Sequence, residues 1–290
     1  MQWQRDLGLT TRVWFTMLLL LIVNLIFLSV LSYLGFGMVW LIVIAFFMAF
    51  AQYFFSDRLV LWSTGAREVS RDEFPELHAI VEKLAKEAEL PMPKVAVMQT
   101  PVPNAFATGR SPSHAVVAVT DSIVRLLTPQ ELEAVLAHEL AHVKNRDMLV
   151  LTIGSFMAML ASIVMQNALF MSMGGNRRQG SGALVWIVAV MAWIVSTLLI
   201  RSLSRYREFG ADRGSAYLTG RPRDLISALY KISGRMDYLP PEPKRQVEGA
   251  NAFFIIPALS GTTLMELFST HPPLEKRVAA LEQVEQELGR

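Results

Sequence analysis

Residues 128–147, TPQELEAVLAHELAHVKNRD, form the stretch that decides the fold of the polar part of this 290-residue chain. Thr128 followed three residues later by Glu131 is a capping box, and Pro129 stands at the first helical position, so a helix is predicted to begin here. The helix carries the pentapeptide His138-Glu139-Leu140-Ala141-His142.

Two histidines four residues apart project from one face of a helix, which lets both imidazoles bind one zinc ion. Glu139 lies about a third of a turn away, where it can reach a water molecule at the metal. The other interpretation is a pair of unrelated polar residues on a solvated face. The apolar run of residues 134–137 argues against it, because a buried histidine pair and carboxylate without partners would be costly. We therefore predict one Zn²⁺ per chain, bound by His138 and His142.

A catalytic zinc ion normally has three protein ligands and one open position. The segment Arg207-Glu208-Phe209-Gly210-Ala211-Asp212 offers the third ligand in Glu208, and Asp212 can hydrogen-bond the free nitrogen of a ligand histidine. Taken alone, two acidic residues four apart usually mark a solvated helix face. Asn145 and Asp147, which follow the zinc helix, are candidates for groups that hydrogen-bond the metal ligands, but a polar helix exit is the favoured interpretation.

Apolar residues make up 52% of the chain and charged residues only 18%, against about 25% in typical soluble domains. The excess is concentrated in four uncharged blocks, residues 13–34, 36–55, 149–173 and 183–200. A spanning helix needs about 20 apolar residues, so we expect four transmembrane helices in two hairpins rather than buried core helices. The first block is longer than the apolar region of a signal peptide, about 7–15 residues, and is interpreted as a retained anchor.

Lys and Arg near the span ends predict the orientation of the chain. In the four-span arrangement one side carries Arg5, Arg12, Arg58, Lys144, Arg146, Arg201, Arg205 and Arg207, and the other carries Arg177 and Arg178. The first side is expected to be cytoplasmic, with both termini and the site there, in a multi-pass membrane protein. The predicted parts are an N-terminal hairpin (1–55), a first polar segment with the zinc helix (56–148), a second hairpin (149–200) and a second polar segment with the third ligand (201–290).

Distances along the chain place the zinc site close to the membrane. Leu149 lies seven positions after His142, and Glu208 lies eight positions after Ile200. If both helices are continuous, these are rises of roughly 10 and 12 Å, so the ligands should lie at similar heights above the cytoplasmic face.

The polar segments predict a mixed α/β structure. Helical patterns cover residues 75–90, 221–235 and 274–288, and strand patterns cover 94–98 and 114–119. The chain has no cysteine, which excludes disulfides and thiolate chemistry, and its net charge of +2 argues against a nucleic-acid partner.

The chain resembles the bacterial HtpX family of membrane-bound zinc endopeptidases and, more distantly, the CAAX prenyl endopeptidases. The residues that carry the resemblance, in this order, are Asn104-Ala105-Phe106-Ala107-Thr108-Gly109, His138 to His142, Glu208 to Asp212, and Thr270-His271-Pro272-Pro273 with Arg277. The resemblance implies a protein of the bacterial inner membrane with an α+β, gluzincin-like protease domain, formed by residues 56–148 and 201–290 and containing a small edge-strand sheet. It also implies proteolysis of membrane or misfolded proteins in quality control. Gly210 departs from related sequences, which often have a larger residue there.

The resemblance also implies roles for single residues. Asn104 and Ala105 would lie on an edge strand that pairs with extended substrate. His271 would donate to the oxyanion, with support from Arg277, although a histidine before two prolines can equally be structural. From the residues themselves, Glu139 is the expected general base.

Three other functions are alternatives to proteolysis of membrane proteins. The nearest is a dedicated prenyl-protein endopeptidase. A non-catalytic zinc-containing membrane protein would have no need of Glu139. A metal transporter usually places ionisable residues inside its spans, and here the charges avoid all four blocks.

Overall fold

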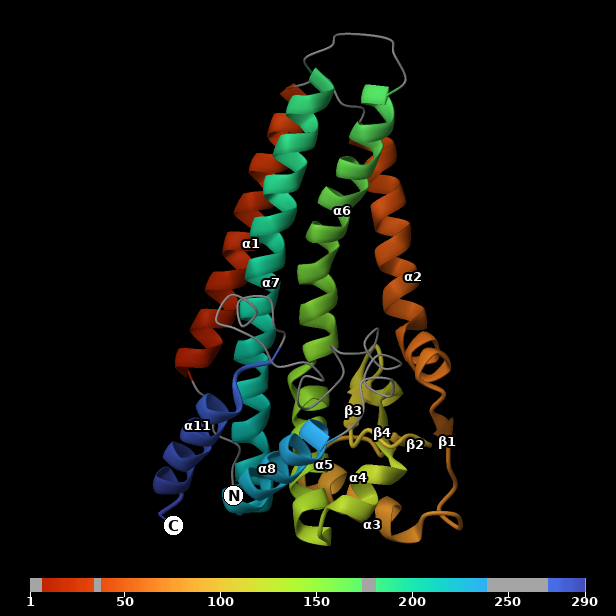
Figure 1. The fold of residues 1–290 in the computed structure, drawn as a ribbon, viewed down its shortest axis with the longest axis vertical. Helices are drawn as coiled ribbons and strands as arrows, with labels where there is room; N and C mark the ends of the chain where they lie inside the picture. The colour runs from red at the N-terminus through yellow and green to blue at the C-terminus, as the bar shows by residue number, and fades with distance from the viewer. Residues whose placement is uncertain (1–6, 34–37, 174–180, 239–270, 290) are drawn as a thin grey trace.

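A computed structural model of the chain describes residues 7–33, 38–173, 181–238 and 271–289. Its long helices run side by side, and the sheet and the shorter helices lie together at one end of them (Figure 1). The long helices are α1 (Leu7–Tyr33), α2 (Met38–Thr64), α6 (Asp147–Met173) and α7 (Ser181–Thr219). The beginning of α1 and the last helix, α11 (Leu274–Glu287), lie at the end that carries the sheet.

Three helices, not the expected four, are long and apolar enough to cross a membrane among the described residues: α1, α6 over Asp147–Gln166, and α7 over Leu184–Thr219. The prediction was wrong for α2, whose apolar stretch covers Phe46–Phe55. Helix α2 nevertheless returns the chain to the sheet, because the first strand begins at Arg67.

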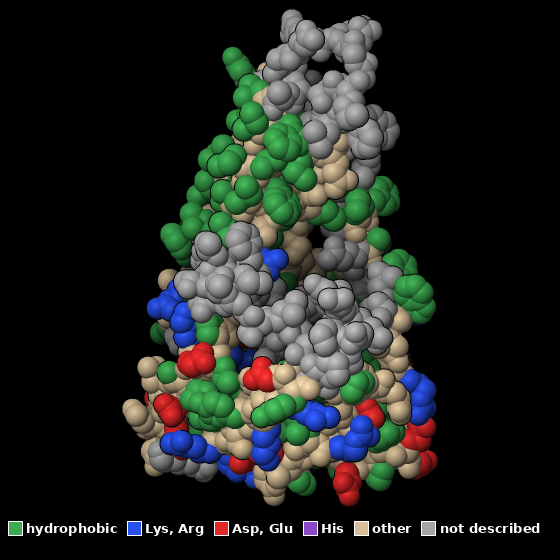
Figure 2. Space-filling model, in the orientation of Figure 1, with side chains coloured by type: hydrophobic (Ala, Val, Ile, Leu, Met, Phe, Trp, Pro, Cys, Tyr) green, Lys and Arg blue, Asp and Glu red, His purple; other side chains and the backbone are tan. Residues whose placement is uncertain are grey.

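The surface of the long helices is apolar. Large hydrophobic side chains such as Trp14, Leu25 and Ile187 are more than half exposed. Figure 2 shows hydrophobic side chains along the long helices, whereas Lys, Arg, Asp and Glu gather over the opposite end. Such a band of exposed apolar side chains fits contact with lipid, and the chain is a multi-pass membrane protein.

A mixed four-stranded sheet has the strand order β1-β2-β4-β3. The strands are β1 (Arg67–Glu68), β2 (Lys94–Met98), β3 (Ala105–Thr108) and β4 (Val116–Thr120). β2 and β4 are parallel, and β1 and β3 are antiparallel to their neighbours. The strand predicted over residues 94–98 is β2, with the same bounds. The strand predicted over residues 114–119 is β4, which begins two residues later than predicted because Pro112–His114 form a 3₁₀ turn.

The predicted zinc helix is α5 (Pro129–Asn145), and it begins as expected. Thr128 N donates to Glu131 Oε2 at 2.8 Å, and Glu131 N donates to Thr128 Oγ1 at 3.3 Å, which completes the capping box. The remaining helices are α3 (Pro75–Glu87), α4 (Asp121–Leu126) and α8 (Pro222–Tyr238). Leu136 and Leu140 of α5 are fully buried in a core that it shares with the sheet, α3, α8 and α11.

The two ligand-bearing helices meet the long helices differently. α7 is continuous from Ser181 to Thr219, as the height estimate assumed. α5 is not continuous with α6: it ends at Asn145, and Arg146 takes the left-handed conformation with φ 56° and ψ 40°. A left-handed residue ends a helix because it turns the backbone out of the helical path. The expectation of a straight run from His142 into the span was therefore wrong.

Glu131 makes the start of α5 sensitive to acid. Burial opposes its charge, but donation from Lys231 and Ser227, each at 2.7 Å, and from Thr128 outweighs this and lowers the pKa of Glu131 to about 2. A folded-state pKa below the ordinary value of 4.5 stabilises the fold above pH 4.5, and this stabilisation is lost as the pH falls towards 2.

We therefore expect Glu131→Gln to lower the free energy of unfolding by about 1–3 kcal/mol at pH 7. The difference between parent and variant should shrink between pH 4.5 and pH 2, as measured by unfolding of the full chain in detergent across that range. Glu87→Gln, at an exposed position of α3, is the control and should have little effect. A difference for Glu131→Gln that stays constant down to pH 2.5 would contradict this explanation.

Candidate metal centre and active site

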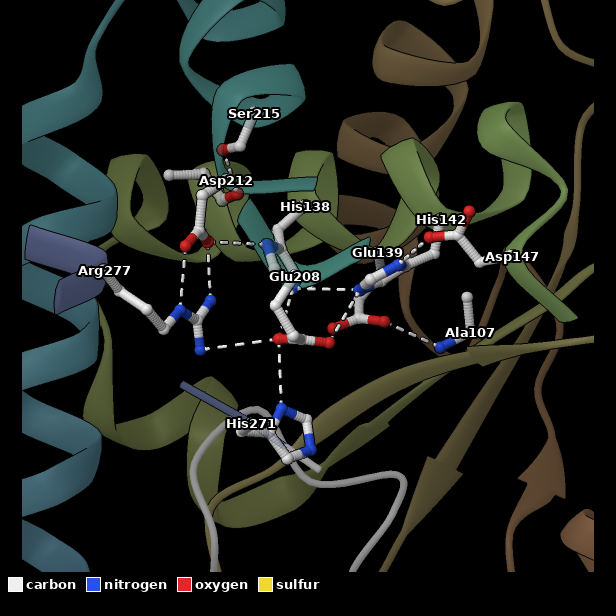
Figure 3. A network of polar contacts seen from close by, with 11 residues as sticks. Ala107, His138, Glu139, His142, Asp147, Glu208, Asp212, Ser215, His271 and Arg277 are labelled. Carbon is white, nitrogen blue, oxygen red and sulfur yellow. Dashed lines mark hydrogen bonds and ion pairs between the residues drawn. The ribbon is translucent and has the colours of Figure 1, made fainter. Parts of the chain in front are cut away.

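Two helices that are far apart in the sequence bring three possible metal ligands together. His138 and His142 come from successive turns of α5, and Glu208 comes from α7 (Figure 3). One ligand atom from each lies within 4.8 Å of the others. Glu208 and His138 are buried, and His142 is partly exposed.

The separations of these atoms fit a zinc ion. His138 Nε2 and His142 Nε2 are 3.1 Å apart, and they lie 3.6 and 3.4 Å from the two Glu208 carboxylate oxygens. Ligands at about 2.0–2.1 Å from a tetrahedral zinc ion lie about 3.3 Å from one another. Two imidazoles and a carboxylate are also a common ligand set of catalytic zinc, so the residues fit this metal in both chemistry and spacing.

Asp212 and Arg277 lie behind His138. Asp212 Oδ1 is 2.9 Å from His138 Nδ1, the nitrogen that faces away from Glu208. Arg277 of α11 donates to both Asp212 oxygens, at 2.8 and 2.6 Å, and both side chains are buried. Its Nη1 lies 3.7 Å from Glu208 Oε2. Asp212 thus contacts the His138 nitrogen that faces away from the ligand set, and Arg277 lies beside both carboxylates.

Asp147 contacts a ligand histidine, although the sequence favoured a polar helix exit over a supporting role for it. Its Oδ2 lies 2.6 Å from His142 Nδ1, and its other oxygen contacts Arg207 of α7. Arg207 also donates to the Asn145 carbonyl at 2.9 Å. A buried acidic residue five positions after the second histidine was the available signal.

Glu139 lies between the ligand atoms and the outer edge of the sheet. Its Oε2 accepts a 2.8 Å hydrogen bond from the main-chain N–H of Ala107 in β3. β3 is one of the two edge strands among the described strands, and this N–H faces Glu139 instead of β4. Gly109 ends the strand with φ 126°, and a Cβ there would lie 2.2 Å from the His114 carbonyl oxygen, so only glycine fits this turn.

The remaining predicted residues flank this arrangement. His271 is buried, and its Nδ1 lies 3.0 Å from Glu208 Oε2. Asn104, just before β3, is also buried, and its main chain is bonded to Thr120 in both directions at 2.9 Å. Thr270, quoted with His271 in the sequence, lies outside the described residues, as do Arg5, Arg177 and Arg178.

Burial and charge act oppositely on the α5 side chains. Burial raises the pKa of Glu139, which suits a group that must accept and return a proton. Burial lowers the pKa of the two histidines, but the carboxylates of Asp212 and Glu208 beside His138, and of Glu208 beside His142, outweigh it and raise both pKa values. Zinc must displace these protons, so the affinity for zinc should decrease as the pH is lowered.

Comparison with known proteins agrees with this geometry. The model of peptidase family M48 matches residues 71–285, most of the chain and all of the ligand set. The chain belongs to this family. It is 57% identical over 292 residues to "Protease HtpX homolog 2" of Methanosarcina mazei, covering 99% of both chains. It is 56% identical to "Protease HtpX homolog" of Moorella thermoacetica, covering 98% of this chain and 96% of that one.

These relatives confirm the HtpX-type assignment, and the chain is an M48 zinc metallopeptidase. They come from archaea as well as bacteria, so the family does not restrict the chain to a bacterial membrane. The crystal structure of S. mikatae Ste24p is similar with a TM-score of 0.58 and 17% identity, covering 94% of this chain and 67% of that one. At this identity the likeness shows the fold alone.

Gly210, where related sequences were expected to have a larger residue, does not crowd the metal centre. It lies inside the unbroken helix α7, two residues after Glu208. A Cβ at this position would meet only the Asn145 side chain, at 4.0 Å, so the site has room for a larger residue.

Proposed function

We propose that this M48 peptidase hydrolyses peptide bonds in extended segments of membrane or misfolded proteins, close to the membrane surface. His138, His142 and Glu208 are the zinc ligands, and Glu139 is the general base. The observation that carries the proposal is the position of Glu139, between a ligand set of zinc spacing and an open strand edge whose Ala107 N–H it binds. That juxtaposition supplies metal, base and substrate platform within one small volume.

When bound, zinc supplies Lewis-acid polarisation of the scissile carbonyl and acidifies a water molecule. Glu139 accepts the proton of the attacking water and later passes it to the leaving amine. The Ala107 N–H holds one carboxylate oxygen, which leaves the other to receive the proton in a fixed orientation. Asp212 holds His138 through its Nδ1, so that Nε2 faces the metal position.

The substrate would add as a strand to the outer edge of β3. Side-by-side residues of a strand alternate in the direction of their main-chain groups. Since the Ala107 N–H faces Glu139, the main-chain groups of Ala105 face the same outer edge, while those of Asn104 face β4. We assign substrate pairing to Ala105 and anchoring of the strand to Asn104. Pairing through the main chain does not read side chains, which suits substrates of varied sequence.

His271 is proposed to donate to the oxyanion that develops on the scissile carbonyl. Its ring lies against Glu208 and below the ligand set, within the same buried cluster (Figure 3). Arg277 supports the site through Asp212 and Glu208, whose negative charges it balances.

We place the protease end of the molecule in the cytoplasm. Arg12 lies near the start of α1 and Arg58 near the end of α2, and Arg201 and Arg205 directly follow the apolar block 183–200 within α7. Basic residues that flank the apolar blocks on the side of the sheet are the arrangement the positive-inside rule expects. A site there acts on loops and tails of membrane proteins and serves their quality control. The 57% identical relatives favour this function over prenyl-protein processing.

Cleavage positions test this proposal. The full chain, reconstituted with a multi-span membrane protein and incubated with zinc, should cut that substrate in its loops and tails on the face that the protease domain shares. Peptides identified by mass spectrometry give the positions, and the same mixture with a chelator is the control. Cuts mainly within the spanning helices of the substrate, or on the opposite face, would overturn both the reach and the orientation.

A further inference from the structure

We propose that Asp147 and Arg207 are positioning residues that hold His142 and Glu208 at zinc-ligand spacing by tying the start of α6 to α7. The inference rests on the proposed roles of His142 and Glu208 as ligands. It assigns a task to two residues that neither bind the metal nor touch the substrate.

The contacts form one continuous chain. Asp147 Oδ2 lies 2.6 Å from His142 Nδ1, so it fixes the ring whose Nε2 faces Glu208. The second Asp147 oxygen contacts the Arg207 guanidinium. The same guanidinium donates to the carbonyl of Asn145, the last residue of α5, at 2.9 Å. Asp147 is 4% exposed and Arg207 14% exposed at the side chain, so water competes little for these contacts.

The chain joins the two segments that must stay in register. Sixty-five residues separate His142 from Glu208, and α5 turns away from α6 at the left-handed Arg146. Nothing in the main chain therefore fixes Glu208 beside His142. Arg207 precedes Glu208 on α7, and neighbouring residues of a helix project about 100° apart. The contact between Asp147 and Arg207 fixes the rotation of α7 about its axis, and thereby the direction in which Glu208 projects.

The other ligand histidine, His138, has a similar support. Arg277 of α11 holds Asp212, and Asp212 holds His138. Each ligand histidine is thus backed by an aspartate that an arginine from a different helix holds in place. The two aspartates approach the ligand set from opposite sides (Figure 3).

Zinc affinity distinguishes positioning from simple packing. The full chain in detergent is stripped of metal and titrated with zinc against a chromophoric chelator at pH 7. Loss of a group that orients a ligand typically lowers affinity 10–100-fold, and we expect this for Asp147→Asn and for Arg207→Gln. The double variant should lose no more than the stronger single variant, because both residues act through one chain of contacts. Arg207→Lys, which keeps the charge, should recover part of the affinity.

Arg213→Gln is the matched control. Arg213 also lies on α7, and its side chain is 17% exposed. It pairs with Glu287 at a distance of 2.7 Å and does not contact the metal ligands. Its zinc affinity should stay within about twofold of the parent. Cobalt-substituted protein gives a second readout: the absorption bands should change in Asp147→Asn and overlay the parent in Arg213→Gln.

Each outcome bears on a different claim. Parent-like zinc affinity in both Asp147→Asn and Arg207→Gln, with lower thermal stability of the metal-free protein, would overturn the positioning role and leave a packing role. A parent chain that binds no zinc would overturn the proposed function instead.

Discussion

Glu139→Gln should reduce peptide hydrolysis about 10²–10⁴-fold while the protein keeps its zinc. Glutamine has nearly the same size and can still accept the Ala107 N–H bond with its amide oxygen, so the strand and helix stay in place. It cannot take up the proton that the attacking water must lose. Initial rates of cleavage and metal content, measured on the same preparation of full-length protein, give both quantities.

Glu133→Gln is the control for this variant. Glu133 lies on the same helix but pairs with Lys83 and Arg221, outside the ligand set. It should cleave substrate at nearly the parent rate. If Glu139→Gln also cleaves within a few-fold of the parent, Glu139 is not the base.

Asp212→Ala should destabilise the protease domain by about 3–5 kcal/mol, because it leaves the Arg277 guanidinium buried without its bidentate partner. Arg277 is 1% exposed and donates to both Asp212 oxygens. The variant should also bind zinc about 10–100-fold more weakly, since His138 loses the carboxylate that orients it. From the sequence alone only the effect on zinc was foreseeable, because the partner of Asp212 lies 65 residues away.

The double variant Asp212→Ala/Arg277→Met separates the two effects. Removal of both charges should restore most of the stability, since replacing a buried ion pair by apolar groups is far less costly than breaking it. Zinc affinity should stay low, because His138 still lacks its partner. Unfolding midpoints and zinc titrations of both variants provide the comparison. Equal stability of the single and double variants would contradict the buried-charge explanation.

Local patterns predicted the core of this structure well. The capping box at Thr128, the spacing of His138 and His142, and the strand over residues 94–98 each rest on contacts within a few residues, which a sequence displays directly. The acidic pair in the segment 207–212 offered the third ligand, Glu208, and the family resemblance added the edge strand around Ala105.

Features that depend on tertiary contacts were missed or misjudged. Asp147 follows a helix end, where polar residues are usual, and only its contact with Arg207 shows that it supports His142. The left-handed turn at Arg146 could not be read from an arginine, because this conformation favours glycine. The second apolar block was expected to be a span, but the described residues of α2 show only the shorter apolar stretch Phe46–Phe55.

Titration of the metal-stripped full chain with zinc, followed by cleavage of an unfolded membrane protein, tests the central claim most directly. Stripped protein should be inactive, and cleavage should return in proportion to added zinc until one ion per chain is bound. Glu208→Ala should show no such return over the same range, because it lacks a ligand. Cleavage that persists without zinc, or that returns in Glu208→Ala with the same end point, would contradict a catalytic site built on His138, His142 and Glu208.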